Sequence, residues 1–270
     1  MKVSVITVCY NAEKDIEKTL LSVIKQSYKD FEYIIVDGKS SDRTMEIVNR
    51  YSERITHIIS EPDTGIYNAM NKGVRLATGE YCIFMNAGDT FAGAEVLRQV
   101  SGYLSGKYDV LVGREISIRD GRIVGYIYPP KQITVMHFYR SSLSHQSSFI
   151  RRDALLKQPY DESLRLVSDW KFWIETLLSR KLSYSPMDVT VSCFNQDGAT
   201  YTQLDLGKKE RTKVLNECLS AEVLSQCRRQ VSRFSLSWFL FRIFRRIRRD
   251  VDLYRLRKYR MDWYNTKNNI

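Results

Sequence analysis

The chain has 270 residues, a length that fits one large domain or a domain with an appendage. Its 43 % of hydrophobic residues suffices for a sizeable core, so the composition excludes a wholly disordered protein. The net charge of +11 is not spread over the chain, because residues 228–260 hold twelve Lys and Arg against two Asp and so carry +10 of it. No nucleic-acid-binding motif accompanies that charge, and we expect no nucleic-acid partner.

The first hundred residues predict alternating strands and helices. Apolar runs predict strands at Val3–Val8, Phe31–Val36, Ile55–Ile59 and Tyr81–Met85. Apolar residues at helical spacing predict helices over 16–24, 45–51 and 66–76. We expect Asn11 to cap the first helix, Ser40 or Ser41 to cap the second, and Gly79 to end the third. This alternation is typical of a largely parallel sheet with helices on both faces.

Three of these strands lead towards acidic residues. Asp37 directly follows the second strand, Asp63 follows the third, and Asn86-Ala87-Gly88 connects the fourth to Asp89. Carboxylates that several strands deliver to one edge of a sheet form a polar rim, which is where nucleotides bind in open α/β sheets. Ordinary turns and helix caps also favour Asp, Asn and Gly, so each aspartate alone is ambiguous. Together they indicate a nucleotide site.

The pattern loosens in the second half. A strand is predicted at Asp109–Gly113, a helix at Ser168–Leu178, a strand at Val189–Phe194, and helix from Leu206 onward. Five scattered cysteines without a Cys-x-x-Cys pair favour reduced thiols in a cytosolic protein over disulfides or zinc. The segment Met1–Thr7 does not have the pattern of a signal peptide.

An ordered series of six short motifs resembles family 2 glycosyltransferases. The motifs are Val8-Cys9-Tyr10-Asn11, Val36-Asp37-Gly38, Pro62-Asp63-Thr64-Gly65, Ala69-Met70-Asn71-Lys72-Gly73, Ala77-Thr78-Gly79-Glu80-Tyr81 and Met85-Asn86-Ala87-Gly88-Asp89. The resemblance implies the GT-A fold, a Rossmann-like α/β domain with a mostly parallel central sheet flanked by helices. We expect that domain over 1–205, with a nucleotide-sugar half at 1–105, an acceptor half at 106–205, and a helical appendage at 206–270.

The resemblance also implies roles for residues of the first half. Tyr10 would pack against the base, Asp37 would hydrogen-bond the base or ribose, and Asp63 would lie beside the base. Asp89 matches the last acid of the family's metal motif and implies a divalent cation, Mn²⁺ or Mg²⁺. Many members carry Asp-x-Asp there, whereas this chain has Asn86-Ala87-Gly88 before Asp89. Fewer carboxylates imply a metal that arrives mostly with the nucleotide diphosphate.

Two residues of the second half complete the expected site. His145 lies in Ser144-His145-Gln146-Ser147-Ser148-Phe149, which resembles a segment near the active site of bacterial members; it would contact the diphosphate or acceptor, or simply pack as a hydrogen-bonded histidine. Asp169, in Ser168-Asp169-Trp170, stands where the family places its catalytic base. A cap at the start of the helix is the alternative role for Asp169.

Residues 236–260 predict a basic amphipathic helix, with apolar residues on one face and arginines on the others. Such a helix suits an anionic membrane surface, although its apolar face would also fit against the catalytic domain or a second subunit. We therefore expect a cytoplasmic protein that is peripheral on the inner face of the plasma membrane.

The sequence favours an inverting, metal-dependent glycosyltransferase. Its donor would be a nucleotide-diphospho-sugar, and its acceptor a hydroxyl of a glycan or lipid-linked molecule in surface polysaccharide synthesis. A nucleotidyltransferase on the same type of sheet and a non-catalytic membrane-binding module remain as alternatives. A nicotinamide dehydrogenase is disfavoured, because no Gly-x-Gly-x-x-Gly follows the first strand.

Overall fold

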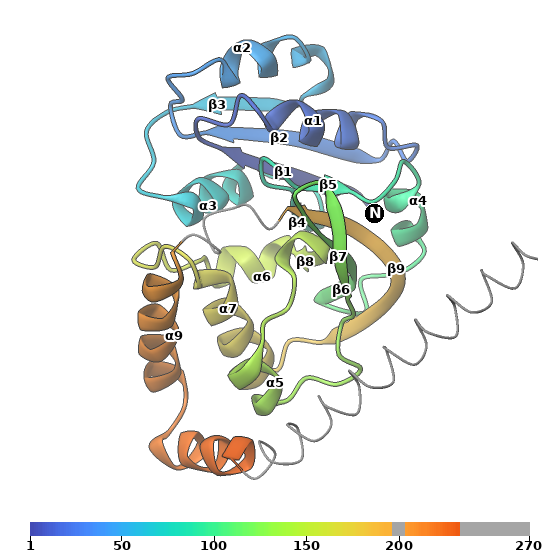
Figure 1. The fold of residues 1–270 in the computed structure, drawn as a ribbon. Helices are drawn as coiled ribbons and strands as arrows, with labels where there is room; N and C mark the ends of the chain where they lie inside the picture. Colours follow the sequence, from blue (N-terminus) through green and yellow to red (C-terminus); the bar gives the residue numbers. More distant parts are fainter. Residues whose placement is uncertain (196–202, 233–270) are drawn as a thin grey trace, which may run out of the picture. The chain divides into compact units, whose positions relative to one another are not determined.

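The computed structural model describes residues 1–195 and 203–232 (Figure 1). The chain divides into two units, Met1–Cys218 and Leu219–Ile270. In the second unit, residues 221–232 are helical, and the basic helix predicted over 236–260 lies outside the described residues. Among the described helices, none combines the length and the apolar character that a membrane span requires.

Nine strands of the described chain form one sheet (Figure 1). They are β1 (Val3–Cys9), β2 (Phe31–Asp37), β3 (His57–Ser60), β4 (Tyr81–Phe84), β5 (Thr90–Phe91), β6 (Val110–Arg119), β7 (Arg122–Ile127), β8 (Ser148–Arg151) and β9 (Tyr184–Asn195). The order is β3-β2-β1-β4-β8-β6-β9-β5, and β7 pairs with β6. The first four strands pair in parallel, whereas β8 runs antiparallel to both β4 and β6 and joins the two halves of the sheet.

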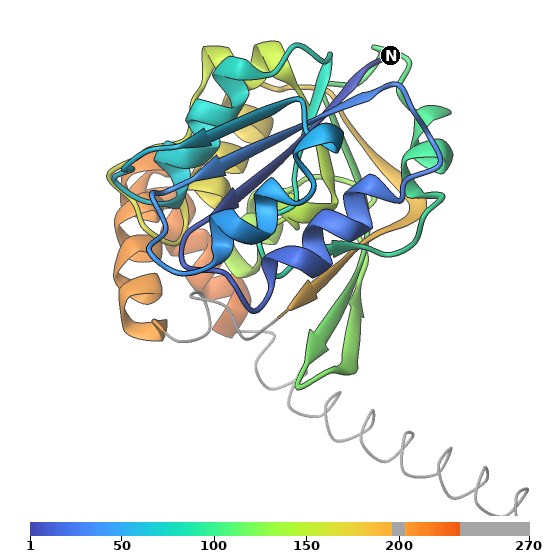
Figure 2. The same ribbon diagram turned by 90° about the horizontal axis from the view of Figure 1, so that it is seen from above.

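Helices flank the sheet, as the α/β prediction requires. They are α1 (Ile16–Ile24), α2 (Thr44–Asn49), α3 (Ile66–Leu76), α4 (Val96–Ser101), α5 (Val135–Arg140), α6 (Arg152–Lys157), α7 (Ser168–Trp173) and α9 (Leu204–Cys218). A π-helical turn, Ile174–Ser179, continues α7, and single 3₁₀ turns occupy Ser52–Arg54 and His145–Ser147. Helices α1 and α2 lie on one face of the first strands and α3 lies on the other (Figure 2).

The core follows from the alternation of side chains along the strands. Val5 of β1 joins Leu20 and Val23 of α1 in one buried cluster. On the opposite face α3 packs so closely that a Cβ on Gly73 would lie 2.5 Å from Cγ2 of Ile6. Both faces of β1 are therefore covered, which explains its uninterrupted apolar sequence.

The predicted N-cap residues serve a different purpose from capping. Asp15 and Arg43 occupy the N-cap positions of α1 and α2, so the predicted caps were wrong. Asn11 instead accepts a hydrogen bond from the backbone N–H of Ser41 at 2.9 Å, and its own N–H donates to Oγ of Ser40 at 2.8 Å. These bonds join the loops that follow β1 and β2. The third helix ends at Leu76, before the predicted Gly79.

Candidate active site

Asp37 ends β2 and is fully buried. Its Oδ2 accepts hydrogen bonds from the hydroxyl of Ser60 at 2.6 Å and from the backbone N–H of Ser40 at 3.0 Å, and its Oδ1 accepts one from the Ser40 hydroxyl. Lys39, between Asp37 and Ser40, has a φ of 64°, a left-handed conformation that favours small residues. The Asp37 carboxylate thus fixes the loop after β2. Its contact with the base or ribose stays a prediction.

Tyr10 and Asp63 meet at Gly38. A Cβ on Gly38 would lie 2.5 Å from Oδ2 of Asp63 and 3.2 Å from Cδ2 of Tyr10, so a larger residue would displace the Asp63 carboxylate. The Tyr10 ring is 64 % exposed, next to the strand end that carries Asp37. The structure therefore brings these three predicted residues together at one edge of the sheet. An exposed aromatic ring beside a carboxylate suits stacking and hydrogen bonding of a nucleobase.

Asp89 lies on a tight turn that α1 holds in place. The backbone N–H of Asp89 donates to the carbonyl of Asn86 at 2.9 Å. The hydroxyl of Thr19 donates to the carbonyl of Asp89 at 2.7 Å and accepts from the N–H of Gly88 at 3.0 Å. Only 6 % of Asp89 is exposed, and its Oδ1 accepts a long hydrogen bond, 3.3 Å, from the N–H of Asn195.

Burial raises the pKa of Asp89 to about 7, and nearby Glu115 adds to the effect, while His145 and the Asn195 N–H oppose it. A buried carboxylate of this kind is stabilised by a cation. On the same turn, Oδ1 of Asn86 is buried without a hydrogen-bond partner in the described part of the chain. The described residues contain no cluster of three or more His, Cys, Asp and Glu that could hold a metal. A carboxylate and an amide oxygen are ligand types that a hard divalent cation takes, so Asp89 and Asn86 fit such a cation.

Asp169 is the second residue of α7, and its carboxylate contacts two side chains. Its Oδ1 accepts a hydrogen bond from the Tyr67 hydroxyl at 2.8 Å, and its Oδ2 lies 3.4 Å from Nδ1 of His145. Burial disfavours the charged carboxylate, but the His145 and Tyr67 contacts outweigh burial and hold the pKa of Asp169 below its usual value. Asp169 is therefore ionised at neutral pH, as a base must be.

His145 connects Asp169 to the Asp89 turn. Its Nε2 lies 3.2 Å from Nδ2 of Asn86, while its Nδ1 faces Asp169. Burial lowers the pKa of His145, but Asp169 and the carboxylates of Asp89 and Glu115 outweigh burial and raise it. Glu115, on β6, is itself buried and accepts a hydrogen bond from the Ser144 hydroxyl. The sequence did not single out Glu115, because an acidic residue within a loosely patterned stretch carries no local signal.

Helix α9 braces the chain on both sides of Asp169. The buried carboxylate of Glu210 accepts hydrogen bonds from the backbone N–H groups of Arg165 at 2.7 Å and Leu166 at 2.9 Å. The guanidinium of Arg211 lies 4.0 Å from the centre of the Trp170 ring. Trp170 is a buried core residue rather than a sugar-stacking one, and its Nε1 donates to backbone carbonyls. Asp169 thus sits on a segment that is held from both sides.

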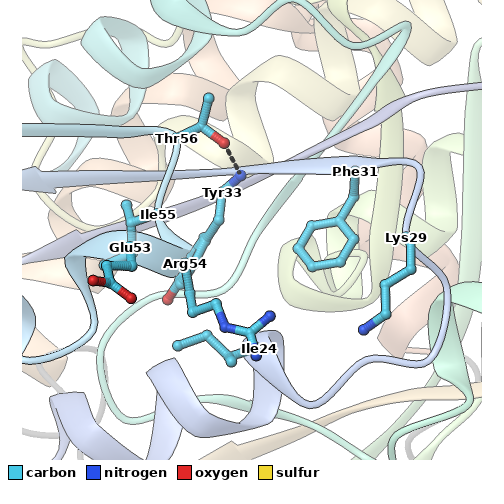
Figure 3. A pocket seen from close by; sticks show the side chains of 8 residues that line it. All are labelled: Ile24, Lys29, Phe31, Tyr33, Glu53, Arg54, Ile55 and Thr56. Atoms are coloured by element: carbon cyan, nitrogen blue, oxygen red, sulfur yellow. Dashed lines mark hydrogen bonds between the residues drawn. The ribbon is translucent and has the colours of Figure 1, made fainter.

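A separate hollow of about 330 Å³ lies away from these residues (Figure 3). Its lining comes from the end of α1, the beginning of β2 with the loop before it, and the chain that precedes β3: Ile24, Lys29, Phe31, Tyr33, Glu53, Arg54, Ile55 and Thr56. Asp37 stands at the other end of β2 from Phe31, about 20 Å away at the rise of a strand. The hollow is therefore not part of the candidate site.

The family model for glycosyl transferase family 2 matches residues 4–155, more than half of the chain. The protein is a member of glycosyl transferase family 2. This matched region includes all the predicted site residues except Asp169.

Curated relatives of this glycosyltransferase support the same family. A PGL/p-HBAD biosynthesis glycosyltransferase of Mycobacterium tuberculosis is 29 % identical over 202 residues, which cover 72 % of this chain and 77 % of the relative. The UDP-Glc:alpha-D-GlcNAc-diphosphoundecaprenol beta-1,3-glucosyltransferase WfgD of Escherichia coli is 27 % identical over 182 residues, covering 67 % and 72 %.

Solved structures confirm the GT-A fold of the glycosyltransferase. S. aureus TarS 1–349, in complex with UDP-GlcNAc, superposes with a TM-score of 0.64 at 22 % identity. The superposition covers 84 % of this chain and 70 % of the TarS chain. The mannosyltransferase PcManGT from Pyrobaculum calidifontis, in complex with GDP-Man and Mn²⁺, gives a TM-score of 0.54 at 18 % identity, covering 71 % and 56 %. At these identities the likeness establishes the fold.

We expect Glu210→Gln to lower the turnover number of the glycosyltransferase and its stability, while donor-nucleotide affinity stays unchanged. Each carboxylate oxygen of Glu210 accepts a hydrogen bond from one backbone N–H group. In Gln, an NH₂ group replaces one of these oxygens, so one N–H loses its acceptor, which costs about 1–3 kcal/mol of unfolding free energy. Urea denaturation and steady-state kinetics measure the two effects. Glu217→Gln on the same helix, which weakens half-exposed ion pairs with Lys171 and Lys213 and leaves the two backbone N–H groups bound, is the matched control. Equal behaviour of both variants would contradict the bracing role.

Thr19→Val is expected to weaken metal-dependent nucleotide binding, although Thr19 itself is not expected to bind the metal or the nucleotide. Valine has nearly the same shape, but it leaves the Gly88 N–H and the Asp89 carbonyl without their partner, at a cost of about 1–3 kcal/mol. Calorimetric titration with nucleotide and Mn²⁺ measures the loss. Ser101→Ala, which removes a hydroxyl bonded to a carbonyl within its own helix, should bind normally. Normal binding by Thr19→Val as well would show that the turn holds its shape without α1.

Proposed function

We propose that this glycosyltransferase moves a sugar from a nucleotide-diphospho-sugar to a hydroxyl of a glycan or lipid-linked acceptor, with inversion at the anomeric carbon. The observation that carries the proposal is the chain of contacts from Asp169 through His145 to Asn86. It joins an ionised carboxylate suited to act as a base to the turn that carries Asp89. This connection supports a site that contains both the base and the group that assists the leaving diphosphate.

In the proposed reaction the acceptor oxygen attacks the anomeric carbon from the side opposite the diphosphate. The carboxylate of Asp169 takes the hydroxyl proton, the bond from the sugar to the diphosphate oxygen breaks, and the nucleoside diphosphate leaves. Tyr67 and His145 orient the Asp169 carboxylate. Tyr10, Asp37 and Asp63 would position the nucleotide, and a contact of His145 with the diphosphate or acceptor stays part of the proposal.

A divalent cation, Mn²⁺ or Mg²⁺, belongs to the proposed site. Asp89 would hold it, assisted by the Asn86 amide oxygen, with the remaining ligands from the diphosphate. When bound, such a cation neutralises the charge that develops on the leaving diphosphate.

The names of the relatives support a uridine donor and a lipid-linked acceptor. WfgD is named for UDP-Glc and a diphosphoundecaprenol acceptor, and the TarS structure contains UDP-GlcNAc. We infer a comparable place for this protein in surface polysaccharide or glycolipid synthesis, at the inner face of the plasma membrane. Residues 236–260 would contribute to membrane attachment. Family membership disfavours the nucleotidyltransferase and the non-catalytic module.

A thermal-shift panel tests the donor site. UDP, GDP, dTDP and CDP, each with and without Mn²⁺, are added to the wild type and to Asp89→Ala. We expect one nucleotide to raise the melting temperature of the wild type in the presence of Mn²⁺ and to have no such effect on the variant. The corresponding nucleotide-sugar is then incubated with a lipid-diphosphate-sugar acceptor, and mass spectrometry identifies the product. No stabilisation by any nucleotide at millimolar concentration would count against the proposal.

A further inference from the structure

The exposed large apolar side chains of the described residues gather at one place. Five of them lie on or beside β7: Ile123, Val124, Tyr126, Ile127 and Tyr128, each between 46 % and 65 % exposed. The other seven are separated from one another along the sequence. Scattered apolar residues are normal on soluble proteins, whereas a contiguous patch marks an interaction surface.

These residues belong to the β6–β7 hairpin, which extends from the rest of the sheet (green in Figure 2). Tyr126 and Ile127 are neighbours in sequence and so point to opposite faces of the strand, yet both are about half exposed. A Cβ on Gly125 would meet no atom within 4 Å. Both faces of β7 are therefore exposed, whereas Glu115 and Ser117 on the neighbouring β6 are buried. A flat protein partner would cover one face, whereas immersion of the hairpin in a soft layer covers both.

The hairpin has the composition of a segment that sits at a lipid–water interface. Arg119 and Arg122 are exposed and lie opposite each other at the turn of the hairpin, with Asp120 as the one acidic residue between them in sequence. Lys131 is exposed beyond the end of β7. The tyrosines at 126 and 128 have the apolar body and polar tip that suit the headgroup region. β7 is an edge strand, so its outer backbone groups need water or headgroups, which excludes deeper burial in hydrocarbon.

Strand β6 connects this hairpin directly to the candidate active site. Glu115, whose charge acts on His145 and Asp89, pairs with Ile127 at the base of the hairpin. Arg119, four residues further along β6, lies about 13 Å from Glu115 at the rise of a strand. That distance is comparable with the length of a sugar and a diphosphate. A bilayer at the hairpin would therefore place a lipid-linked acceptor within reach of the site.

We propose that the β6–β7 hairpin docks on an anionic phospholipid surface. The apolar residues of β7 would lie in the headgroup layer, and the basic residues Arg119, Arg122 and Lys131 would contact the lipid phosphates. The purpose of this docking rests on the proposed function, because it presents a lipid-linked acceptor to Asp169. The docking itself is a separate property, which can be measured without sugar transfer.

The test places an environment-sensitive fluorophore on the full-length chain at Val124→Cys. A label at Tyr103→Cys, on an exposed residue remote from the hairpin in sequence, is the control, and wild type treated with the same reagent gives the background. Vesicles of phosphatidylcholine alone are compared with vesicles that contain about 30 % phosphatidylglycerol. We expect the emission of the label at 124 to shift to the blue with the anionic vesicles only, and the label at 103 to stay unchanged.

Three results would overturn the proposal. The label at 124 could stay in water while the chain sediments with the anionic vesicles, which would show attachment by another segment. It could shift without vesicles as the protein concentration rises, which would assign the hairpin to a second copy of the chain. It could shift equally with both vesicle types, which would exclude recognition of anionic lipid.

A fourfold variant links docking to activity: Ile123→Ser, Val124→Ser, Tyr126→Ser and Ile127→Ser. All four side chains are exposed, so the fold is expected to be retained, as circular dichroism will verify. Transfer to an acceptor in vesicles is expected to fall about tenfold, since membrane affinity scales with buried apolar area, while transfer to a water-soluble acceptor stays unchanged. Equal losses with both acceptors would contradict the docking role. If the wild type transfers no sugar at all, the proposed function fails and the fluorescence result still decides the docking.

Discussion

Replacing Asp169 with Asn is expected to lower the turnover number for sugar transfer about 10³-fold while leaving the affinity for donor nucleotide unchanged. Asn has the same shape and still accepts a hydrogen bond from the Tyr67 hydroxyl, but it cannot take the proton of the acceptor. General-base catalysis contributes about 10²–10⁴-fold, which sets the size of the loss. Single-turnover kinetics with a radiolabelled donor measure it. Activity within a few fold of wild type would remove Asp169 from the base role.

Tyr67→Phe is the matched control for that prediction. It removes one hydrogen bond to the Asp169 carboxylate and leaves the carboxylate in place. Because that bond helps to hold the pKa of Asp169 low, its loss is expected to raise this pKa. The acid limb of the pH dependence of kcat should move to higher pH, with a much smaller loss of rate at neutral pH than in Asp169→Asn. An unchanged profile would mean that another group controls the acid limb.

Asp89→Asn is expected to abolish metal-dependent nucleotide binding and yet to stabilise the metal-free protein above pH 7. Loss of a residue that only supports a metal ligand lowers metal affinity by about 10- to 100-fold. Loss of the proposed ligand Asp89 should lower the affinity by more than that. Asn keeps the shape and can still accept the hydrogen bond from the Asn195 N–H. Isothermal titration with nucleotide and Mn²⁺ measures the affinity.

The stability change follows from the pKa of Asp89, which burial raises from 3.8 to about 7. Between these pH values the folded protein keeps a proton that the unfolded chain has lost. The contribution of Asp89 to stability is therefore fully present below about pH 4 and is lost as the pH rises through 7. Since each pKa unit corresponds to about 1.4 kcal/mol, the variant should exceed the wild type by on the order of 2–4 kcal/mol at pH 8 without metal. Urea denaturation at pH 5 and pH 8 tests this, and a variant less stable at pH 8 would contradict it.

The nucleotide half of the fold could be predicted well from the sequence. Strands β1, β2 and β4 are buried on both faces, so each appears as an unbroken apolar run. Helix α3 has the predicted bounds, because one of its faces packs on the sheet while the other carries polar residues. In this region local pattern and tertiary structure agree.

The second half could not be predicted as well, because its elements depend on distant partners. β8 has only four residues and pairs with β4 and β6, which local periodicity does not reveal. The helix predicted over Ser168–Leu178 is α7 followed by a π-helical turn, in which the Thr176 hydroxyl donates to the carbonyl of Phe172. β9 is twelve residues long, although only Val189–Phe194, in its C-terminal half, was predicted.

The site shows the same division. Tyr10, Asp37, Asp63, Asp89, His145 and Asp169 were selected from motifs, and their contacts with substrate stay predictions. The groups that orient them could not be found in this way. Tyr67 contacts Asp169 across 102 residues, and Glu210 supports the same segment from a helix beyond the family's matched region. Such pairs are set by the packing of whole elements, to which a single sequence gives no direct access.

The support that α9 gives to the Asp169 segment has a consequence for the order of events during synthesis. A chain emerges from the ribosome N-terminus first, and each domain generally folds as a unit. Tyr10, Asp37 and Asp89 are translated long before Glu210 and Arg211, although all five belong to the unit Met1–Cys218. A nascent chain without α9 has the residues proposed to bind the nucleotide but lacks the helix that supports the Asp169 segment. We therefore expect sugar transfer to require a chain that has been made at least through α9, so that shorter chains leave the donor unused.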